Sequence, residues 1–166
     1  MSALGTRIEL AGADEVDAVR ELWLHLHHHH RRVAASLPLV DDDELSWQRR
    51  RARYLARLAS GSGLLVLARE ADAVVAYAFL FIEDGADDTF PLGGRYAELY
   101  SLSVEPRLRG RGIGTQLLDF VDRELASRSI GGLEVAVMSG NDAARRFYER
   151  RGLREAEVVM FRFVGD

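Results

Sequence analysis

The chain of 166 residues has a formal net charge of −4 and no cysteine, which excludes disulfides, thiol catalysis and cysteine-ligated metals. Its composition, 48% hydrophobic and 29% charged, is typical of one ordinary soluble domain, which we place at residues 1–166. The acidic balance argues against a general nucleic-acid binder, and no apolar run approaches the roughly 20 residues of a membrane helix. Because the beginning of the chain lacks a signal-peptide pattern, we expect a cytoplasmic protein.

The first half of the chain is predicted to form a strand, two helices and a hairpin. Apolar residues recur at helical spacing in two stretches, and short β-rich runs lie before and after them. The expected elements are a strand at 6–10, helices at 15–32 and 44–59, and strands at 64–69 and 74–82. The second helix carries five arginines, which we interpret as a solvated face: Arg49, Arg50, Arg51, Arg53 and Arg57.

The end of the first predicted helix carries His25 and the run His27 to His30. Consecutive helical residues point in different directions, so four adjacent histidines cannot all face one metal ion, and we expect no metal site. Two interpretations remain open. The run is either a polar helix end whose cations suit the helix dipole, or one or two of its histidines face a substrate site.

The rest of the chain is organised around residues 98–115. An apolar run, Leu99 to Val104, predicts a buried strand, and Pro106 ends it because proline has no N–H for the ladder. A helix reaching about Arg128 begins inside the glycine run that follows, Gly110, Gly112 and Gly114. This order of elements suits a phosphate, since glycines let the backbone approach and helical N–H groups point at the anion. Three cations accompany the loop: Arg107, Arg109 and Arg111.

The glycine run has neither the Gly-Lys-Ser/Thr end of a P-loop nor the spacing of a dinucleotide fingerprint. Its sequence, Arg109-Gly110-Arg111-Gly112-Ile113-Gly114, resembles the Arg/Gln-x-x-Gly-x-Gly/Ala signature of the Gcn5-related N-acetyltransferase (GNAT) superfamily. A second block is similar to that family as well: a strand at 133–138, then Asn141 with Ala144, Phe147-Tyr148-Glu149 and Gly152 on or beside a helix at 142–151. Leu153 stands where the family usually has Phe. A last strand is expected at 154–164.

The resemblance implies an α/β fold, a central mixed sheet flanked by about four helices in the order β-α-α-β-β-β-α-β-α-β. The crossover from the strand at 99–104 to that at 133–138 should make a parallel pair. It also implies acetyl-coenzyme A as co-substrate and no metal. The predicted contacts of its pyrophosphate are Arg109, Gly110, Arg111, Gly112, Ile113, Gly114 and Thr115. In the family a bulged strand exposes backbone to the pantetheine arm, here near Leu102, Ser103 and Val104.

Two residues are implied as catalytic, Glu98 and Tyr148. An amine must lose its proton before it accepts an acetyl group, so Glu98 is the candidate base; the alternative is a solvated strand-end carboxylate. Tyr148 matches the family tyrosine that protonates the leaving thiolate and also contacts the cofactor; the alternative is a core aromatic. Asn141 is expected to hydrogen-bond the pantetheine arm, to cap its helix, or both. Phe147 is expected in the core.

The predicted activity is acetyl transfer from acetyl-CoA directly to a primary amine, of a small molecule or a protein. The alternative is a catalytically silent CoA-binding sensor or interaction module of the same fold. The identity of the acceptor is not given by any motif, although two acidic segments, Asp41–Asp43 and the loop with Asp84, Asp87 and Asp88, could gather a cationic amine. Neither nucleic acid nor a membrane is an expected partner, and a homodimer and a monomer both remain open.

Overall fold

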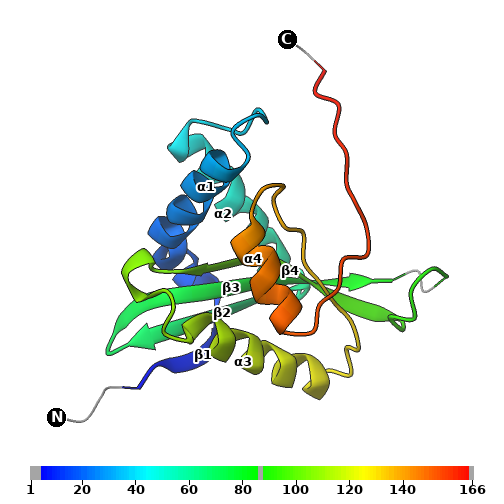
Figure 1. Ribbon diagram of the computed structural model, residues 1–166. Helices are drawn as coiled ribbons and strands as arrows, with labels where there is room; N and C mark the ends of the chain where they lie inside the picture. The colour runs from blue at the N-terminus through cyan, green and yellow to red at the C-terminus, as the bar shows by residue number, and fades with distance from the viewer. Residues whose placement is uncertain (1–4, 86–87, 165–166) are drawn as a thin grey trace.

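A five-stranded sheet lies at the centre of the computed structural model, which describes residues 5–85 and 88–164 (Figure 1). The strands follow one another in space in chain order: β1 (Arg7–Ala11), β2 (Gly63–Glu70), β3 (Ala73–Asp84), β4 (Arg95–Val104) and β5 (Leu133–Glu134). Neighbours from β1 to β4 are antiparallel, and β4 and β5 are parallel. The mixed sheet and its parallel crossover are therefore confirmed.

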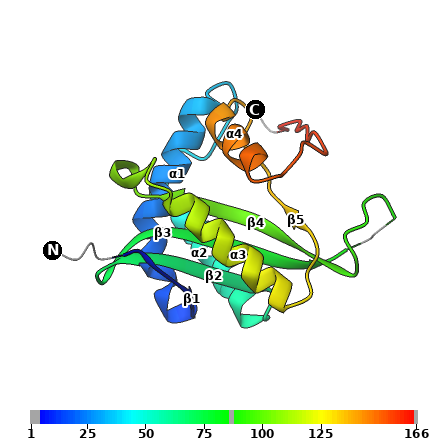
Figure 2. The same cartoon turned by 60° about the horizontal axis from the view of Figure 1, so that its bottom comes forward.

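Helices cover both faces of this sheet (Figure 2). One face packs against a 3₁₀ segment, η1 (Ala13–Val19), and helices α1 (Arg20–Val33) and α2 (Asp43–Ala59). The opposite face packs against α3 (Ile113–Ser127), with side chains of α4 (Asp142–Arg150) at its margin. A short 3₁₀ turn, η2 (Pro106–Leu108), joins β4 to the glycine run. No helix in the described ranges is long and apolar enough to span a membrane.

Two apolar clusters, one on each side of the sheet, form the core. Strand β3 is buried on both faces from Val75 to Phe81, which is why its sequence is an unbroken apolar run rather than an alternating one. On the α2 side, the ring of Tyr54 stacks on Phe79 with centroids 3.9 Å apart. Its buried hydroxyl donates to the Ser101 hydroxyl at 2.6 Å, so both of these buried groups have a hydrogen-bond partner.

Strand β4 contains a β-bulge at Tyr100. Leu99 pairs with Leu80 and Ser101 pairs with the adjacent Phe79, so Tyr100 has no partner in β3. Two consecutive side chains, Tyr100 and Ser101, therefore both lie on the α2 side of the sheet. The family resemblance implied a bulge in this strand, and the register locates it just before Leu102.

Three details of the sequence prediction are wrong. The strand expected at 133–138 keeps ladder pairing only at Leu133 and Glu134, because β4 and the chain after Glu134 diverge. The first turns of the helix expected at 15–32 are 3₁₀ rather than α. The last strand, expected at 154–164, does not form: that segment has no neighbouring strand and runs away from the sheet (Figure 1).

Candidate active site

A narrow cavity of about 70 Å³ lies where β4 and β5 separate. Beyond the Glu98–Glu134 pair no ladder joins the two strands, and Figure 2 shows β5 leading away from β4 toward α4. The walls come from five parts of the chain. They are Leu26 and His30 of α1, Leu99 to Leu102 of β4, Val135 to Met138, Asn141, and Ala144 and Tyr148 of α4.

The edge of β4 that faces this cavity offers unpaired backbone. The Glu105 amide donates to Val75 in β3, so strand alternation turns the N–H and C=O groups of Leu102 and Val104 to the opposite edge. Leu102 lines the cavity, and the Val104 carbonyl accepts a hydrogen bond from Arg109 Nε at 3.2 Å. Ser103 does not reach the cavity, since its hydroxyl donates to the Leu22 carbonyl at 2.8 Å in α1.

The glycine run has the conformation that the sequence predicts. Gly110 and Gly112 have φ of +75° and +83°, in the left-handed region that favours glycine, and Gly112 is the N-cap of α3. A Cβ added at Gly114 would lie 3.4 Å from the Phe147 ring, so the small residue lets α4 approach α3. Within the described chain, the amides of Ile113, Gly114 and Thr115 donate to no backbone acceptor and point out of the helix start.

Each of the three loop arginines has a different partner. Arg107 forms an ion pair with Glu105, and Arg111 lies 4.0 Å from Glu70. Arg109 bonds to the strand carbonyl instead, and partial burial together with the nearby Arg32 guanidinium lowers its pKa. The neighbouring guanidinium groups of Arg109 and Arg32, together with the free amides at the start of α3, favour the binding of an anion.

Asn141 occupies the junction of β5, α4 and α1. Its Oδ1 accepts the Ala144 amide at 3.3 Å, which caps α4, and also lies 3.2 Å from His29 Nε2. Because a carbonyl oxygen only accepts, His29 must carry its proton on Nε2. The Asn141 side chain is buried and lines the cavity, and its oxygen is occupied by the cap interaction. The helix-capping role predicted for Asn141 is confirmed, and its contact with the pantetheine arm stays a prediction.

Tyr148 projects from α4 into the same cavity. Burial raises the pKa of its hydroxyl to about 12, so the phenol stays protonated at neutral pH. Phe147, its neighbour, packs on the α3-side core near Gly114, as predicted for a core aromatic. The two rings meet edge to face with centroids 5.2 Å apart, which fixes the orientation of Tyr148.

Glu98 is half-buried on the α2 side of β4, two residues before the bulge, and is not among the residues that line the cavity. Burial raises its pKa, and the carboxylates of Glu134 and Glu83 raise it further, against the opposing effect of Arg57 and Arg50. A carboxylate with a raised pKa is a better proton acceptor than an ordinary carboxylate. The pKa of Glu98 is raised because Arg57 and Arg50 only partly offset the effects of burial and of the two neighbouring carboxylates.

The structure separates the histidines into different roles. His27 is buried, stacks on Trp23 and contacts the Val40 carbonyl at 2.7 Å, while His28 pairs with Asp43 at 2.8 Å. His30 lines the cavity, where burial and the nearby His29, His27 and Arg50 lower its pKa to about 4. Sequence reasoning left the substrate-facing role open; helical position alone could not select His30. In the described residues no group of acids and histidines could hold a metal ion.

The prediction that the arginines of α2 form a solvated face holds for Arg49, Arg51 and Arg53 but is wrong for Arg50 and Arg57. The Arg50 guanidinium lies 3.8 Å from the Trp23 ring centroid and 4.2 Å from that of Tyr100, and it donates to Ser101. Arg57 lies over Phe81 and pairs with Glu83 at 2.6 Å. These cations therefore cover the aromatic wall behind the bulge rather than extend into solvent.

The acidic segments offer less free charge than expected. Asp42 caps α2 by accepting the Leu45 amide at 2.9 Å, and Asp43 is held by His28 and Arg31. Asp84 is exposed at the end of β3, and Asp87 lies outside the described residues.

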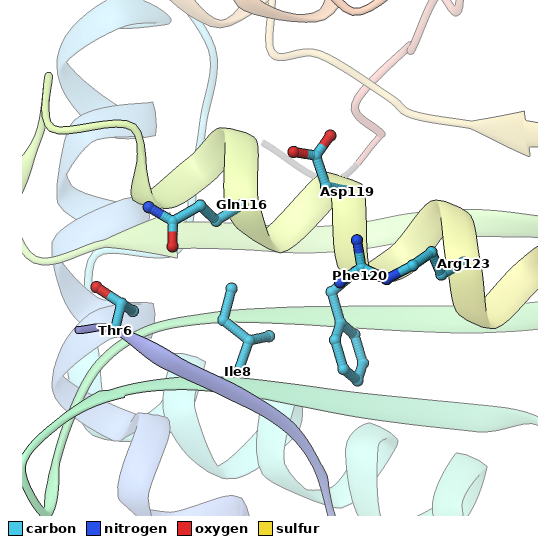
Figure 3. A pocket seen from close by; sticks show the side chains of 6 residues that line it. All are labelled: Thr6, Ile8, Gln116, Asp119, Phe120 and Arg123. Carbon is cyan, nitrogen blue, oxygen red and sulfur yellow. The ribbon is translucent and has the colours of Figure 1, made fainter.

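A larger hollow, about 370 Å³, lies elsewhere, between β1 and the outer side of α3 (Figure 3). Its walls are Thr6, Ile8, Gln116, Asp119, Phe120 and Arg123. The figure shows these side chains spread along a wide, open gap between strand and helix, and none of the predicted site residues is among them. The smaller cavity is therefore the better candidate for the active site, because the predicted site residues Leu102, Asn141 and Tyr148 line it.

The model of the acetyltransferase (GNAT) family matches residues 17–153. The fold is similar to that of a GCN5-related N-acetyltransferase from Ralstonia eutropha JMP134, with a TM-score of 0.79, 22% identity, and coverage of 97% of this chain and 100% of the other. A predicted acetyltransferase with acetyl-CoA from Clostridium acetobutylicum has a TM-score of 0.76 at 18% identity, covering 96% and 97%. A ribosomal-protein-alanine N-acetyltransferase from Brucella melitensis biovar Abortus 2308 has a TM-score of 0.67 at 17% identity, with coverage of 96% of this chain and 99% of the other.

The family match and the fold thus define an acetyltransferase. The chain belongs to the acetyltransferase (GNAT) family.

Proposed function

We propose that this protein binds acetyl-CoA along the opening between β4 and β5 and transfers the acetyl group directly to a primary amine. The observation that supports this is the shared cavity, which collects the backbone edge of Leu102, the amide of Asn141 and the phenol of Tyr148. These groups lie on two elements of the chain that are far apart in sequence. Only the short turn η2 separates β4 from the glycine run, so a long ligand can extend from this cavity to the start of α3.

The residues present fit such a ligand. Free amides at Ile113 to Thr115, with Arg109 beside them, suit the pyrophosphate. The amide-rich pantetheine arm needs donors and acceptors in extended register, and the open edge offers the N–H and C=O of Leu102 and the N–H of Val104, whose carbonyl is already bonded to Arg109. The Asn141 NH₂ group adds one side-chain donor. Ser103 has no such role in this proposal, because strand alternation turns its backbone N–H and C=O toward β3, as it does those of Glu105.

In the proposed reaction the amine nitrogen attacks the thioester carbonyl carbon, and the carbon–sulfur bond breaks. Glu98 takes the amine proton through water, since it does not line the cavity itself. Tyr148 gives its phenolic proton to the leaving thiolate. A phenol with a pKa of about 12 is protonated when this step begins. Because the thiol it forms has an ordinary pKa of roughly 8.5, the transfer is uphill, and it is completed when the Tyr148 phenolate regains a proton from solvent and Glu98 releases the amine proton to solvent.

The acceptor is proposed only as a primary amine. The Brucella relative is named for a protein alanine, but at 17% identity the likeness concerns the fold alone. A panel that includes a polyamine, an amino sugar and a peptide with a free amino end separates the acceptor classes. The chain contains no lysine, so any acetyl-lysine in such an assay belongs to the acceptor.

The test combines two measurements on the same protein. Calorimetry should show CoA binding, and thiol release should show turnover on at least one amine of the panel. The Glu98→Gln variant should keep CoA affinity and turn over about 10²–10⁴-fold more slowly, and its residual kcat/KM should lack the acid limb of the parent's pH profile. Binding without turnover on any amine would instead support a silent CoA-binding module.

A further inference from the structure

A stack of aromatic rings and guanidinium groups lies on the α2 side of the bulge. The Tyr100 ring stacks on the Phe81 ring with centroids 4.0 Å apart, and the Arg50 guanidinium lies over the Tyr100 ring at 4.2 Å. Arg50 also lies over the Trp23 ring at 3.8 Å, and Arg57 lies over Phe81 at 4.3 Å. Because Tyr100 also lines the active-site cavity, the stack places cations beside the place where the reaction is proposed to occur.

The arginines of this region come from one face of α2. Arg50, Arg53 and Arg57 follow one another at the spacing that brings residues to the same side of a helix. Arg53 donates to the Tyr100 hydroxyl at 2.8 Å, next to Arg50. Arg57 forms an ion pair with Glu83 at 2.6 Å, whereas no carboxylate of the described residues forms an ion pair with Arg50 or Arg53. The charges of these two arginines are therefore not compensated by the described part of the protein.

Arg50 combines partial burial with N–H groups that have no acceptor. Its hydrogen bond to the Ser101 hydroxyl, at 3.4 Å, uses only one of the donors of the guanidinium group. Its nitrogens are not among the fully enclosed side-chain atoms that lack a partner, so the remaining donors can be reached from solvent. A partly desolvated cation without a carboxylate partner favours an anionic ligand.

Glu98, the proposed base, lies on the same side of the sheet, two positions before Tyr100. Two strand positions span about 6–7 Å, so one small molecule can contact both Glu98 and the cations around the Tyr100 ring. Arg50 is close enough to Glu98 to oppose the rise of its pKa, and close enough to His30 to contribute to the lowered pKa of that cavity residue. A proton acceptor and an anion-binding group thus lie beside the same opening.

We propose that the acceptor is a small amine with a carboxylate next to its amino group, as in a free amino acid, and that Arg50 and Arg53 bind this carboxylate while the amine faces Glu98. This inference rests on the proposed function, because it names the acceptor class of the same site. Arginine suits the role, since its paired N–H groups match the two oxygens of a carboxylate. A purely cationic acceptor fits this surface less well, because Asp42 is engaged in a helix cap and Asp43 in ion pairs.

The product of this reaction is an N-acetyl amino acid. The amine nitrogen bonds to the acetyl carbon as the carbon–sulfur bond breaks, the amine proton leaves through Glu98, and CoA leaves as the thiol. The carboxylate takes no part in these steps and stays bound to the arginines. The product therefore keeps the group that Arg50 and Arg53 recognise.

Free amino acids compared with their amides provide the first test. The amide keeps the side chain and the amine but has no negative charge. The best acceptor should be a free acid, with kcat/KM about 10–100-fold above that of its amide, the value of a hydrogen bond to a charged group. Easier deprotonation cannot cause this preference, because a neighbouring carboxylate favours the charged form of the amine. Amides that react as fast as the acids would overturn this inference and leave acetyl transfer standing, whereas no turnover on any amine would overturn both.

Arginine variants assign the carboxylate to its site. Arg50→Gln should lower the acid-to-amide ratio of kcat/KM about 10-fold, mainly through a higher KM for the acid. Arg53→Gln, at an exposed position, should lower it about three-fold. Arg49→Gln is the matched control, because Arg49 is an exposed arginine on another face of the same helix, and it should keep the ratio of the parent. An unchanged ratio in either Arg50→Gln or Arg53→Gln, with the far-UV circular dichroism of the parent, would overturn the assignment.

Binding of the product gives a readout that needs no turnover. Calorimetry on CoA-saturated protein should show that the N-acetyl form of the best acid binds about 10–100-fold more tightly than its N-acetyl amide. Arg50→Gln should remove most of this difference. Equal affinities of the two N-acetyl compounds for the parent protein would refute a carboxylate site.

Discussion

His29 and Asn141, 112 positions apart in the chain, are in hydrogen-bonding contact: His29 Nε2 lies 3.2 Å from Asn141 Oδ1. The contact joins the end of α1 to the start of α4 across the mouth of the cavity. It holds the Asn141 oxygen, already engaged by the Ala144 amide, and so leaves the NH₂ group for the proposed pantetheine contact.

Asn141 allows the cap and the ligand contact to be separated. Serine caps helices about as well as asparagine, so Asn141→Ser should leave the free energy of unfolding within about 0.5 kcal/mol, whereas Asn141→Ala should lower it by roughly 1 kcal/mol. Both variants lack the NH₂ group and should weaken CoA binding about five-fold, the value of one ordinary hydrogen bond. Urea unfolding and calorimetry measure the two effects; equal CoA affinity in Asn141→Ser and parent would leave Asn141 with a structural role only.

Gly112→Asp should abolish CoA binding. At φ of +83° a side chain is strained, and this one places a carboxylate at the helix start that would face phosphate. Gly61→Asp is the control for backbone strain, because Gly61 has φ of +73° and equally open surroundings but follows α2. Retained CoA affinity in a folded Gly112→Asp protein would contradict the pyrophosphate assignment.

Tyr148→Phe should lower turnover by about 10²–10⁴-fold and leave CoA affinity within a few-fold, since only the proton donor is lost. The measurement is kcat on the best amine, with affinity from calorimetry. Phe147→Leu is the matched comparison: it changes the neighbouring core ring and should affect stability more than chemistry. Unchanged turnover in Tyr148→Phe would mean that water or another group protonates the thiolate.

His30 should make stability depend on pH. Its folded pKa is about 4, against an ordinary 6.5, so below pH 6.5 the unfolded chain binds a proton that the folded chain does not. The contribution of His30 to the free energy of unfolding should therefore be complete above pH 6.5. It should decrease as the pH drops toward 4, by up to about 3 kcal/mol. Urea unfolding of parent and His30→Gln at pH 7 and pH 4.5 checks this, and parallel curves would show that His30 titrates normally.

The sequence was sufficient for features that are encoded locally. Helical spacing after Gly114 and the proline at position 106 fixed the strand–loop–helix unit, and the left-handed φ values of Gly110 and Gly112 agree with it. The N-cap at Asn141 could also be predicted from the sequence, because capping involves residues only three positions apart.

Features that depend on packing between distant segments were not predictable from the sequence. Nothing in the local sequence distinguishes Tyr100 from its neighbours, and the bulge exists only in the register with β3. The place of Arg50 between Trp23 and Tyr100 requires α1, α2 and β4 together. The pattern at 154–164 does predict a strand, but a strand needs a partner edge, and propensity alone does not supply one.

The bulge also has a consequence for how this chain tolerates changes in length. Without Tyr100, Leu99 and Ser101 would become neighbours opposite Leu80 and Phe79, and every other pair of β3 and β4 would remain as it is. Tyr100 is therefore a one-residue insertion in an otherwise regular ladder. Deleting it should yield a folded protein whose core residues keep their faces, but whose β4 is straight and opens less widely from β5. Loss of CoA binding in such a folded, shortened chain would show that the separation of β4 from β5 depends on Tyr100.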